Sequence, residues 1–145
     1  MHFVEQTKFN YPAGDCVRAA WISLLGLPPS LVPDFSPGVL GNGVDQLEEE
    51  RKWIRGLGFD LVVVPARGDA INVPDHVWHL VSGLSPRGWG HRCVGRGGKL
   101  VWDPHPSHLG LVDVWSYTFL VPLLDNGPEE AVDEGPELVG FHGWL

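Results

Sequence analysis

The chain has few cysteines, few basic residues and no long apolar run, and each shortage excludes a class of protein. Two cysteines among 145 residues cannot form the disulfide framework of a small secreted domain. Ten lysines and arginines against 18 acidic residues give a net charge of −8, whereas binding to nucleic acid depends on clustered basic side chains. No run approaches the roughly 18 apolar residues that would span a bilayer. We therefore expect neither a nucleic-acid nor a membrane partner.

The composition and length predict one compact unit followed by a tail. The first residues contain no apolar segment of the kind that directs secretion, so we expect a cytoplasmic protein with reduced thiols. A chain of 145 residues corresponds to one domain, which we assign to residues 1–124. Residues 125–145 are acidic and rich in glycine and proline, and this composition is typical of a solvated C-terminal tail.

Hydrophobic periodicity predicts two helices followed by several strands. The first helix begins at Cys16 and ends at Gly26, before two prolines. We expect a loop over residues 28–43, with Leu31, Val32 and Phe35 in the core, and an α+β fold in which N-terminal helices pack on an antiparallel sheet. The second helix covers residues 44–55, and the strands cover 59–64, 76–81, 91–95, 99–103 and 115–122.

Cys16 is the first candidate for a reactive group. Asp15 is a good helix N-cap, so Cys16 occupies the first helical position, where the macrodipole stabilises a thiolate. The preceding Gly14 leaves the sulfur uncovered. A buried cysteine that acts as a small hydrophobic residue is the alternative.

A predicted hairpin brings a histidine beside a carboxylate. A three-residue loop over residues 96–98 places His91 opposite Asp103, and opposed residues share one face of a sheet. A carboxylate that orients an imidazole is part of a nucleophilic triad. The alternative is a two-residue turn at 97–98, which places Asp103 opposite Arg92 as an ordinary ion pair.

Further residues are candidates for binding substrate. Gln6 precedes the cysteine by ten residues, and its amide is a candidate donor to a developing oxyanion. The proline-stiffened loop that follows Trp102 predicts a cleft wall containing His105 and Ser107, and Trp89 is a candidate recognition residue. A solvated glutamine, a rigid surface turn and a core tryptophan are the respective alternatives.

A metal site is the alternative use of the same side chains. His91 and Cys93 alternate onto one face and could join the 103–108 loop as ligands, but the chain has no CxxC or HxxxH pair. We therefore expect neither a metal nor another cofactor.

Several of these segments together resemble a known family. They are Gln6, the stretch GDCVRAA at 14–20, SPRG at 85–88, His91 and VWDPHPS at 101–107. They resemble the small papain-like cysteine peptidase-like proteins of phage and bacteria, which are similar to double-glycine leader peptidases. The resemblance implies a papain-like fold, a bacterial or phage-infected cell, and a catalytic set of Cys16, His91, Asp103 and Gln6.

Two functions of different classes are compatible with these residues. The first is a cysteine-dependent hydrolase or acyl transferase that acts on the amide bond of a peptide or protein. The second is a non-catalytic binding module on a papain-like scaffold, such as a phage accessory protein that engages a host factor.

Overall fold

The computed structural model describes residues 2–67 and 71–124, so the predicted tail lies outside the described residues. Three α-helices and one 3-10 turn precede or flank a five-stranded antiparallel sheet with the order β1-β5-β2-β3-β4. The predicted α+β class is confirmed. The elements are α1 (Cys16–Leu25), η1 (Pro29–Leu31), α2 (Pro37–Leu40), α3 (Gln46–Gly56), β1 (Phe59–Pro65), β2 (Trp78–Leu84), β3 (Gly90–Arg96), β4 (Lys99–Trp102) and β5 (Asp113–Pro122).

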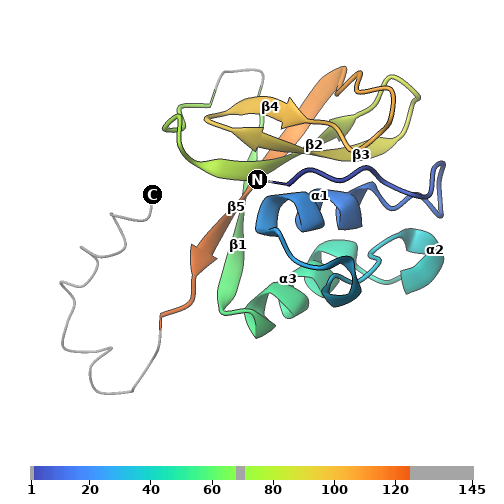
Figure 1. The fold of residues 1–145 in the computed structure, drawn as a ribbon, viewed down its shortest axis with the longest axis horizontal. Helices are drawn as coiled ribbons and strands as arrows, with labels where there is room; N and C mark the ends of the chain where they lie inside the picture. Colours follow the sequence, from blue (N-terminus) through green and yellow to red (C-terminus); the bar gives the residue numbers. More distant parts are fainter. Residues whose placement is uncertain (1, 68–70, 125–145) are drawn as a thin grey trace.

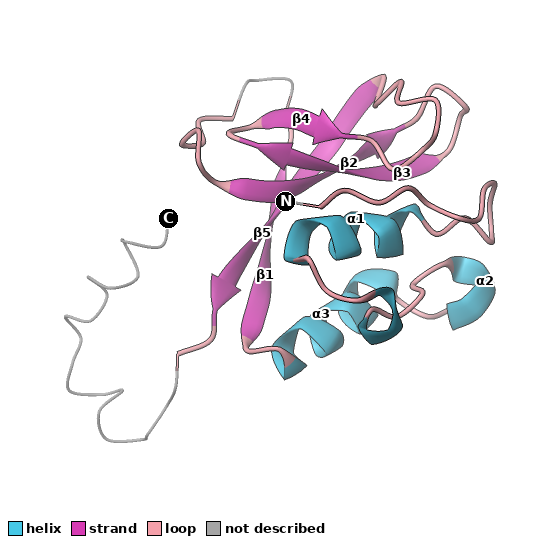
Figure 2. Ribbon diagram, in the orientation of Figure 1, coloured by secondary structure: helices cyan, strands magenta, loops and turns pink. Residues whose placement is uncertain are grey.

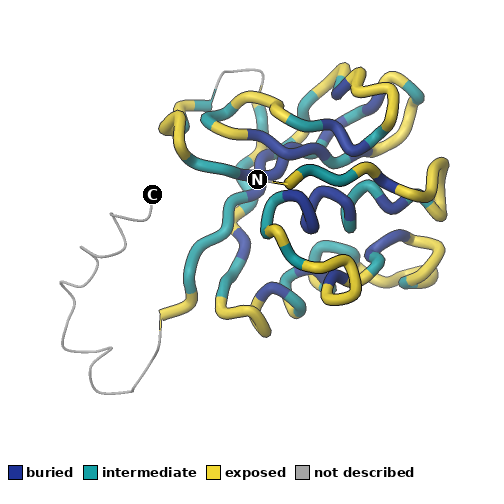
Figure 3. Tube along the Cα trace, viewed as in Figure 1, coloured by how far each residue is buried: buried dark blue, intermediate teal, exposed yellow. Residues whose placement is uncertain are grey.

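The helices lie together on one side of the sheet (Figures 1 and 2). Helix α1 contacts β2 and β3, and α3 contacts β1. The core between these layers is made of large apolar side chains, among which Trp21, Ile54, Leu80 and Val94 are fully buried. Figure 3 shows the buried stretches of α1 and of the sheet strands facing one another. Within the described ranges, no helix is long and apolar enough to cross a membrane.

The loop predicted over residues 28–43 is only partly irregular. It contains the single turn η1 and the short helix α2, each of which begins at or next to a proline that is preorganised for a helical start. Val32 and Phe35 are buried in the core as expected, but the prediction for Leu31 is wrong, because this side chain is exposed. Gly26 ends α1 in the left-handed conformation, with φ 66°.

The β3–β4 hairpin differs from the expected register. Gly97 and Gly98 both have positive φ, 64° and 83°, which suits a two-residue turn, and Arg96 pairs directly with Lys99. The prediction of a three-residue loop over residues 96–98 is therefore wrong. A bulge then shifts the pairing, so that Val94 opposes Trp102. Strand β4 ends there, and Asp103 pairs with neither His91 nor Arg92 in the ladder.

Candidate functional site

Asp15 fastens the N-terminal segment to the start of α1. It occupies the N-cap position, but its carboxylate makes no capping hydrogen bond to the helix, so this part of the prediction is wrong. The carboxylate instead accepts hydrogen bonds from Thr7 N at 2.8 Å, Thr7 Oγ1 at 2.7 Å and Lys8 N at 2.9 Å. Gln6 N donates to Pro104 O at 3.0 Å. The N-terminal segment thus joins the start of α1 to the loop that follows β4.

His91 and Asp103 form a buried hydrogen-bonded pair, as predicted. His91 Nε2 and Asp103 Oδ1 lie 2.6 Å apart, and the two side chains are 4% and 1% exposed. The carboxylate is held by two backbone donors as well, because His105 N donates to Oδ1 and Gly110 N donates to Oδ2, each at 2.8 Å. Three donors therefore fix the carboxylate, and the carboxylate fixes the imidazole.

This pairing sets the charge of both groups. Burial alone would disfavour the imidazolium of His91, but the hydrogen bond to Asp103, followed by interactions with the Cys16 and Cys93 thiols, raises the pKa of His91 to about 11. Burial would likewise raise the pKa of Asp103, but the hydrogen bonds from His91, His105 and Gly110 lower it to about 2. The pair is an imidazolium and a carboxylate at neutral pH.

The two thiols differ in their surroundings, although both contact the same imidazole. Cys16 begins α1 and is partly exposed, whereas Cys93 lies in β3 and is fully buried. Burial raises the pKa of Cys93. Because His91 Nε2 is bonded to Asp103, its Nδ1 is the nitrogen that remains for a thiol. Cys16 is the thiol that a reagent in solution can reach.

Gln6 is buried and lines the same cavity as Cys16 and His91. Its Nε2 donates to Lys8 O at 2.8 Å, and its Oε1 has no hydrogen-bond partner among the described residues. The second N–H of the same amide nitrogen is the donor that an oxyanion would use.

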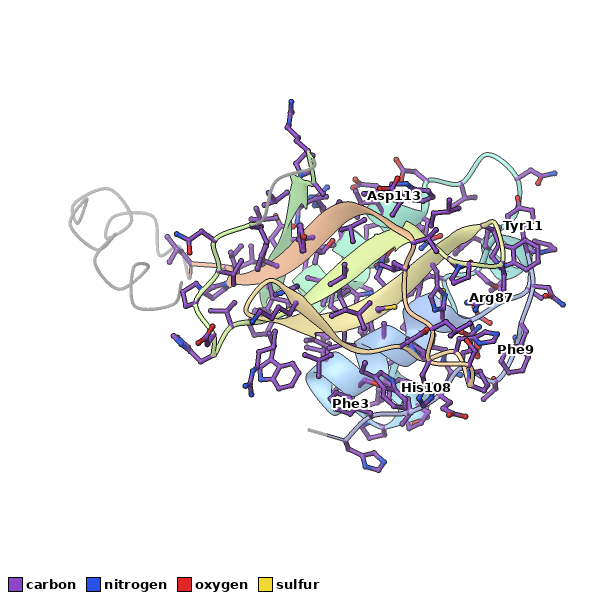
Figure 4. All side chains as sticks on the ribbon, turned by 90° about the horizontal axis from the view of Figure 1, so that it is seen from above. Phe3, Phe9, Tyr11, Arg87, His108 and Asp113 are labelled. Atoms are coloured by element: carbon purple, nitrogen blue, oxygen red, sulfur yellow. The ribbon has the colours of Figure 1, made fainter. Side chains whose placement is uncertain are left out.

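A cavity of about 460 Å³ opens beside the thiol and the imidazole, which is within the usual size range of small-molecule sites. It is lined by Gln6, Cys16 and His91 and by residues of α2, α3, β1, β2 and β5. Tyr11 and Arg87, which also line it, lie at the same end of the molecule (Figure 4). Three of the four predicted catalytic residues, Gln6, Cys16 and His91, line the cavity. The fourth, Asp103, does not line it but contacts His91.

Two of the three predicted substrate-binding residues, Trp89 and His105, line the cavity, and the third, Ser107, does not. Ser107 is exposed, accepts a hydrogen bond from Arg87 and contacts His105 Nδ1 at 2.9 Å. It therefore contacts two residues of the cavity wall, Arg87 and His105, without lining the cavity itself.

Trp115 is a cavity residue that the sequence analysis did not assign to the site. Ser82 pairs with Ser116 and Gly83 pairs with Val114, so Trp115 is the extra residue of a bulge in β5. A bulge explains how Trp115 and Ser116, although consecutive, both line the cavity. Gly83 permits this bulge, because a Cβ at that position would lie 2.0 Å from Asp113 O. The sequence offered no such signal, because the predicted strand ended at residue 81 and left Gly83 outside it, whereas β2 continues to Leu84.

The sequence analysis also did not predict the ion pair between Glu50 and Arg92. Glu50 of α3 is fully buried and paired with Arg92 of β3, and it accepts a hydrogen bond from Trp21 Nε1 at 2.7 Å. Both charged residues line the cavity. Nothing in the sequence pairs residues 42 positions apart.

The donors of His91, Cys93 and Asp103 lie within 4.8 Å of one another and are the candidate metal ligands of the described residues. Two ligands of a tetrahedral zinc ion are spaced by about 3.3 Å, given bonds of roughly 2.0–2.1 Å. His91 Nε2 and Asp103 Oδ1 are closer, at a hydrogen-bonding distance of 2.6 Å. A cation would have to displace this bond, so the group fits a charged pair better than a metal site.

A comparison of the chain with protein-family models, curated proteins and solved structures finds no significant match. The function of the protein is therefore inferred from the geometry and chemistry of the site itself.

Proposed function

We propose that this protein is a papain-like cysteine hydrolase or acyl transferase that acts on an amide or peptide bond. One observation carries the proposal: a partly exposed thiol at the start of a helix interacts with a buried imidazole that is itself held by a carboxylate, beside a cavity. A nucleophile, a base and a group that orients the base are the parts of a nucleophilic triad. The resemblance of the GDCVRAA and DPHPS segments to papain-like proteins agrees with this assignment.

In the proposed first step, the Cys16 thiolate attacks the substrate carbonyl carbon. The carbon–sulfur bond forms and the carbonyl electron pair moves to oxygen, where the Cys16 backbone N–H and the Gln6 amide can donate to it. When the tetrahedral intermediate collapses, the carbon–nitrogen bond breaks and the leaving amine takes a proton from His91. The result is a thioester on Cys16, with a neutral imidazole beside it.

In the second step, His91 removes a proton from water or from another amine as it attacks the thioester. The new carbon–oxygen or carbon–nitrogen bond forms, the carbon–sulfur bond breaks, and the sulfur leaves as the thiolate. Asp103 stays ionised throughout and stabilises the imidazolium. Hydrolysis and acyl transfer differ only in the nucleophile that enters at this point.

Acylation by an activated ester tests the proposal without knowledge of the natural substrate. We expect p-nitrophenyl acetate to release a burst of nitrophenolate and to leave an acetyl group on Cys16, detected by mass spectrometry of intact protein and its peptides. The Cys16→Ala variant should lose the burst, and the Cys93→Ala variant should keep it. A burst that survives in Cys16→Ala would overturn the proposal.

A binding module is the second candidate. Tyr11, Trp89 and Trp115 line the cavity and are 70%, 38% and 48% exposed, and exposed aromatic side chains are typical of recognition surfaces. In that case neither thiol would be acylated.

A further inference from the structure

The cavity extends from Cys16 and His91 to a set of polar residues that the proposed chemistry does not use. We call these six residues the polar pocket: Gln46, Glu50, Ser82, Arg92, Ser116 and Thr118. Ser82 is the partner of Arg92 in one ladder and of Ser116 in the next, so these three residues form a row across β3, β2 and β5 on one face of the sheet. Helix α3 contributes Gln46 and Glu50 from the facing layer.

The charges within the polar pocket cancel. Arg92 donates to both carboxylate oxygens of Glu50 through Nη1 and Nη2, and its Nε donates to Ser82 Oγ at 2.9 Å. A guanidinium has five N–H groups, so two remain beyond these three bonds. An arginine that is only 12% exposed and is held by both oxygens of a carboxylate is rigid, and it is electrically neutral together with its partner.

The polar pocket offers acceptors as well as donors. Gln46 Nε2 donates to Glu50 Oε2 at 3.2 Å, which leaves the amide oxygen of Gln46 as an acceptor. Ser116 and Thr118 contribute hydroxyls, which can donate or accept. A group that fits must therefore be neutral and must present an acceptor and a donor together.

We propose that the polar pocket selects a substrate that carries a carboxamide side chain, glutamine or asparagine, next to the amide bond under attack. The carboxamide oxygen accepts from the spare N–H groups of Arg92, and its NH₂ group donates to the acceptors of Gln46 and Ser116. A carboxylate is disfavoured because Glu50 already neutralises Arg92, and an apolar side chain leaves these groups without partners. This inference rests on the proposed function, because Cys16 must be the nucleophile.

Peptidyl chloromethyl ketones test the selectivity, since attack by the cysteine sulfur forms a thioether and expels chloride. One series varies the residue that bears the ketone among glutamine, glutamate and leucine, and a second series varies the residue before it. The rate of alkylation at Cys16 is measured by peptide mass spectrometry. Methyl methanethiosulfonate, which has no carboxamide and no side chain to recognise, forms a mixed disulfide with the cysteine and expels methanesulfinate, and it reports the reactivity of the thiol in the same samples.

We expect the glutamine compound of at least one series to react at least tenfold faster than its glutamate and leucine counterparts. Ser116→Ala should reduce this preference several-fold, with each rate divided by the methyl methanethiosulfonate rate of the same variant. Ser30→Ala, which removes an exposed hydroxyl outside the cavity, should change neither the preference nor the methyl methanethiosulfonate rate. Arg92→Lys should abolish the preference, and thermal melting of each variant checks that it is folded.

The outcomes separate the two proposals. Equal rates in both series, or a preference for glutamate or leucine, with a fast methyl methanethiosulfonate reaction at Cys16, would overturn the carboxamide pocket alone. A slow methyl methanethiosulfonate reaction at Cys16 would overturn the proposed function and, with it, this inference.

Discussion

Replacement of Asp103 by asparagine removes the charge from the buried pair and keeps the shape of the side chain. One carboxylate oxygen accepts from His91 and His105, and the other accepts from Gly110. An asparagine can keep an acceptor for only one of these sides, because its nitrogen is a donor. Asp103→Asn therefore removes both a charge interaction and one buried hydrogen bond.

The lowered pKa of Asp103 determines how much folding stability the substitution should remove. The pKa of Asp103 is lowered from 3.8 to about 2, and a difference of this size corresponds to about 2 kcal/mol of folding stability at neutral pH. The pKa of His91, about 11, would imply a larger value, but burial of both charged groups opposes their attraction and favours the smaller one. With the lost hydrogen bond, worth about 1 kcal/mol, we expect a loss of about 2–4 kcal/mol.

The loss should depend on pH in both directions. The pKa of Asp103 is lower in the folded state, so its contribution is present above about pH 4 and disappears as the pH falls toward 2. The pKa of His91 is higher in the folded state, so its contribution is complete below about pH 6.5 and declines as the pH rises toward 11. The difference between wild type and variant should therefore be largest near pH 5.

Urea unfolding at pH 3, 5 and 9 measures this difference. Asp75→Asn, at an exposed carboxylate, serves as the matched control and should change stability by less than about 0.5 kcal/mol at every pH. A loss in Asp103→Asn that is the same at all three pH values would refute the charged pair. The rate of acylation at Cys16 should also fall, because an asparagine cannot stabilise the imidazolium.

Three further variants test parts of the fold that position the site. Gly83→Ala should destabilise the protein by several kcal/mol or rearrange the bulge, because its Cβ would overlap the Asp113 carbonyl; thermal melting checks this, and a stability equal to wild type would contradict the bulge. Asp15→Ala should cost about 2–3 kcal/mol through three lost hydrogen bonds to residues 7 and 8, and faster amide exchange in that segment would support the role, whereas unchanged exchange would oppose it. Glu50→Ala should cost about 3–5 kcal/mol in urea unfolding, because it removes the carboxylate partner of a guanidinium that is only 12% exposed, and a loss below about 1 kcal/mol would show that the pair is solvated.

The α+β class and the places of Cys16 and His91 in the secondary structure could be predicted because local rules govern them. A helix start at Cys16, a glycine stop at Gly26 and β-branched strands are set by residues close in sequence. The proximity of His91 and Asp103 was predicted correctly although its register was wrong. A bulge after the two-residue turn moves the chain, and the carboxylate reaches the imidazole from beyond the end of β4.

The rest of the site depends on pairings between distant segments. The Glu50–Arg92 ion pair joins α3 to β3, and the Trp115 bulge depends on the neighbouring strand. Asp15 bonds to the N-terminal segment rather than to its own helix, although both uses of its carboxylate satisfy backbone N–H groups. Local propensity cannot choose between such partners, since tertiary packing decides which donors come within reach.

The sharpest test of the nucleophilic site is the rate at which iodoacetamide alkylates each of the two cysteines at pH 6, measured by peptide mass spectrometry in wild type and in His91→Gln. An ordinary thiol, with a pKa of about 8.5, is almost entirely protonated at this pH. We predict that Cys16 reacts much faster than Cys93 in the wild type and slows to an ordinary rate in His91→Gln. Slow reaction of both thiols in the wild type, or a Cys16 rate that is the same without the imidazole, would contradict the nucleophilic site.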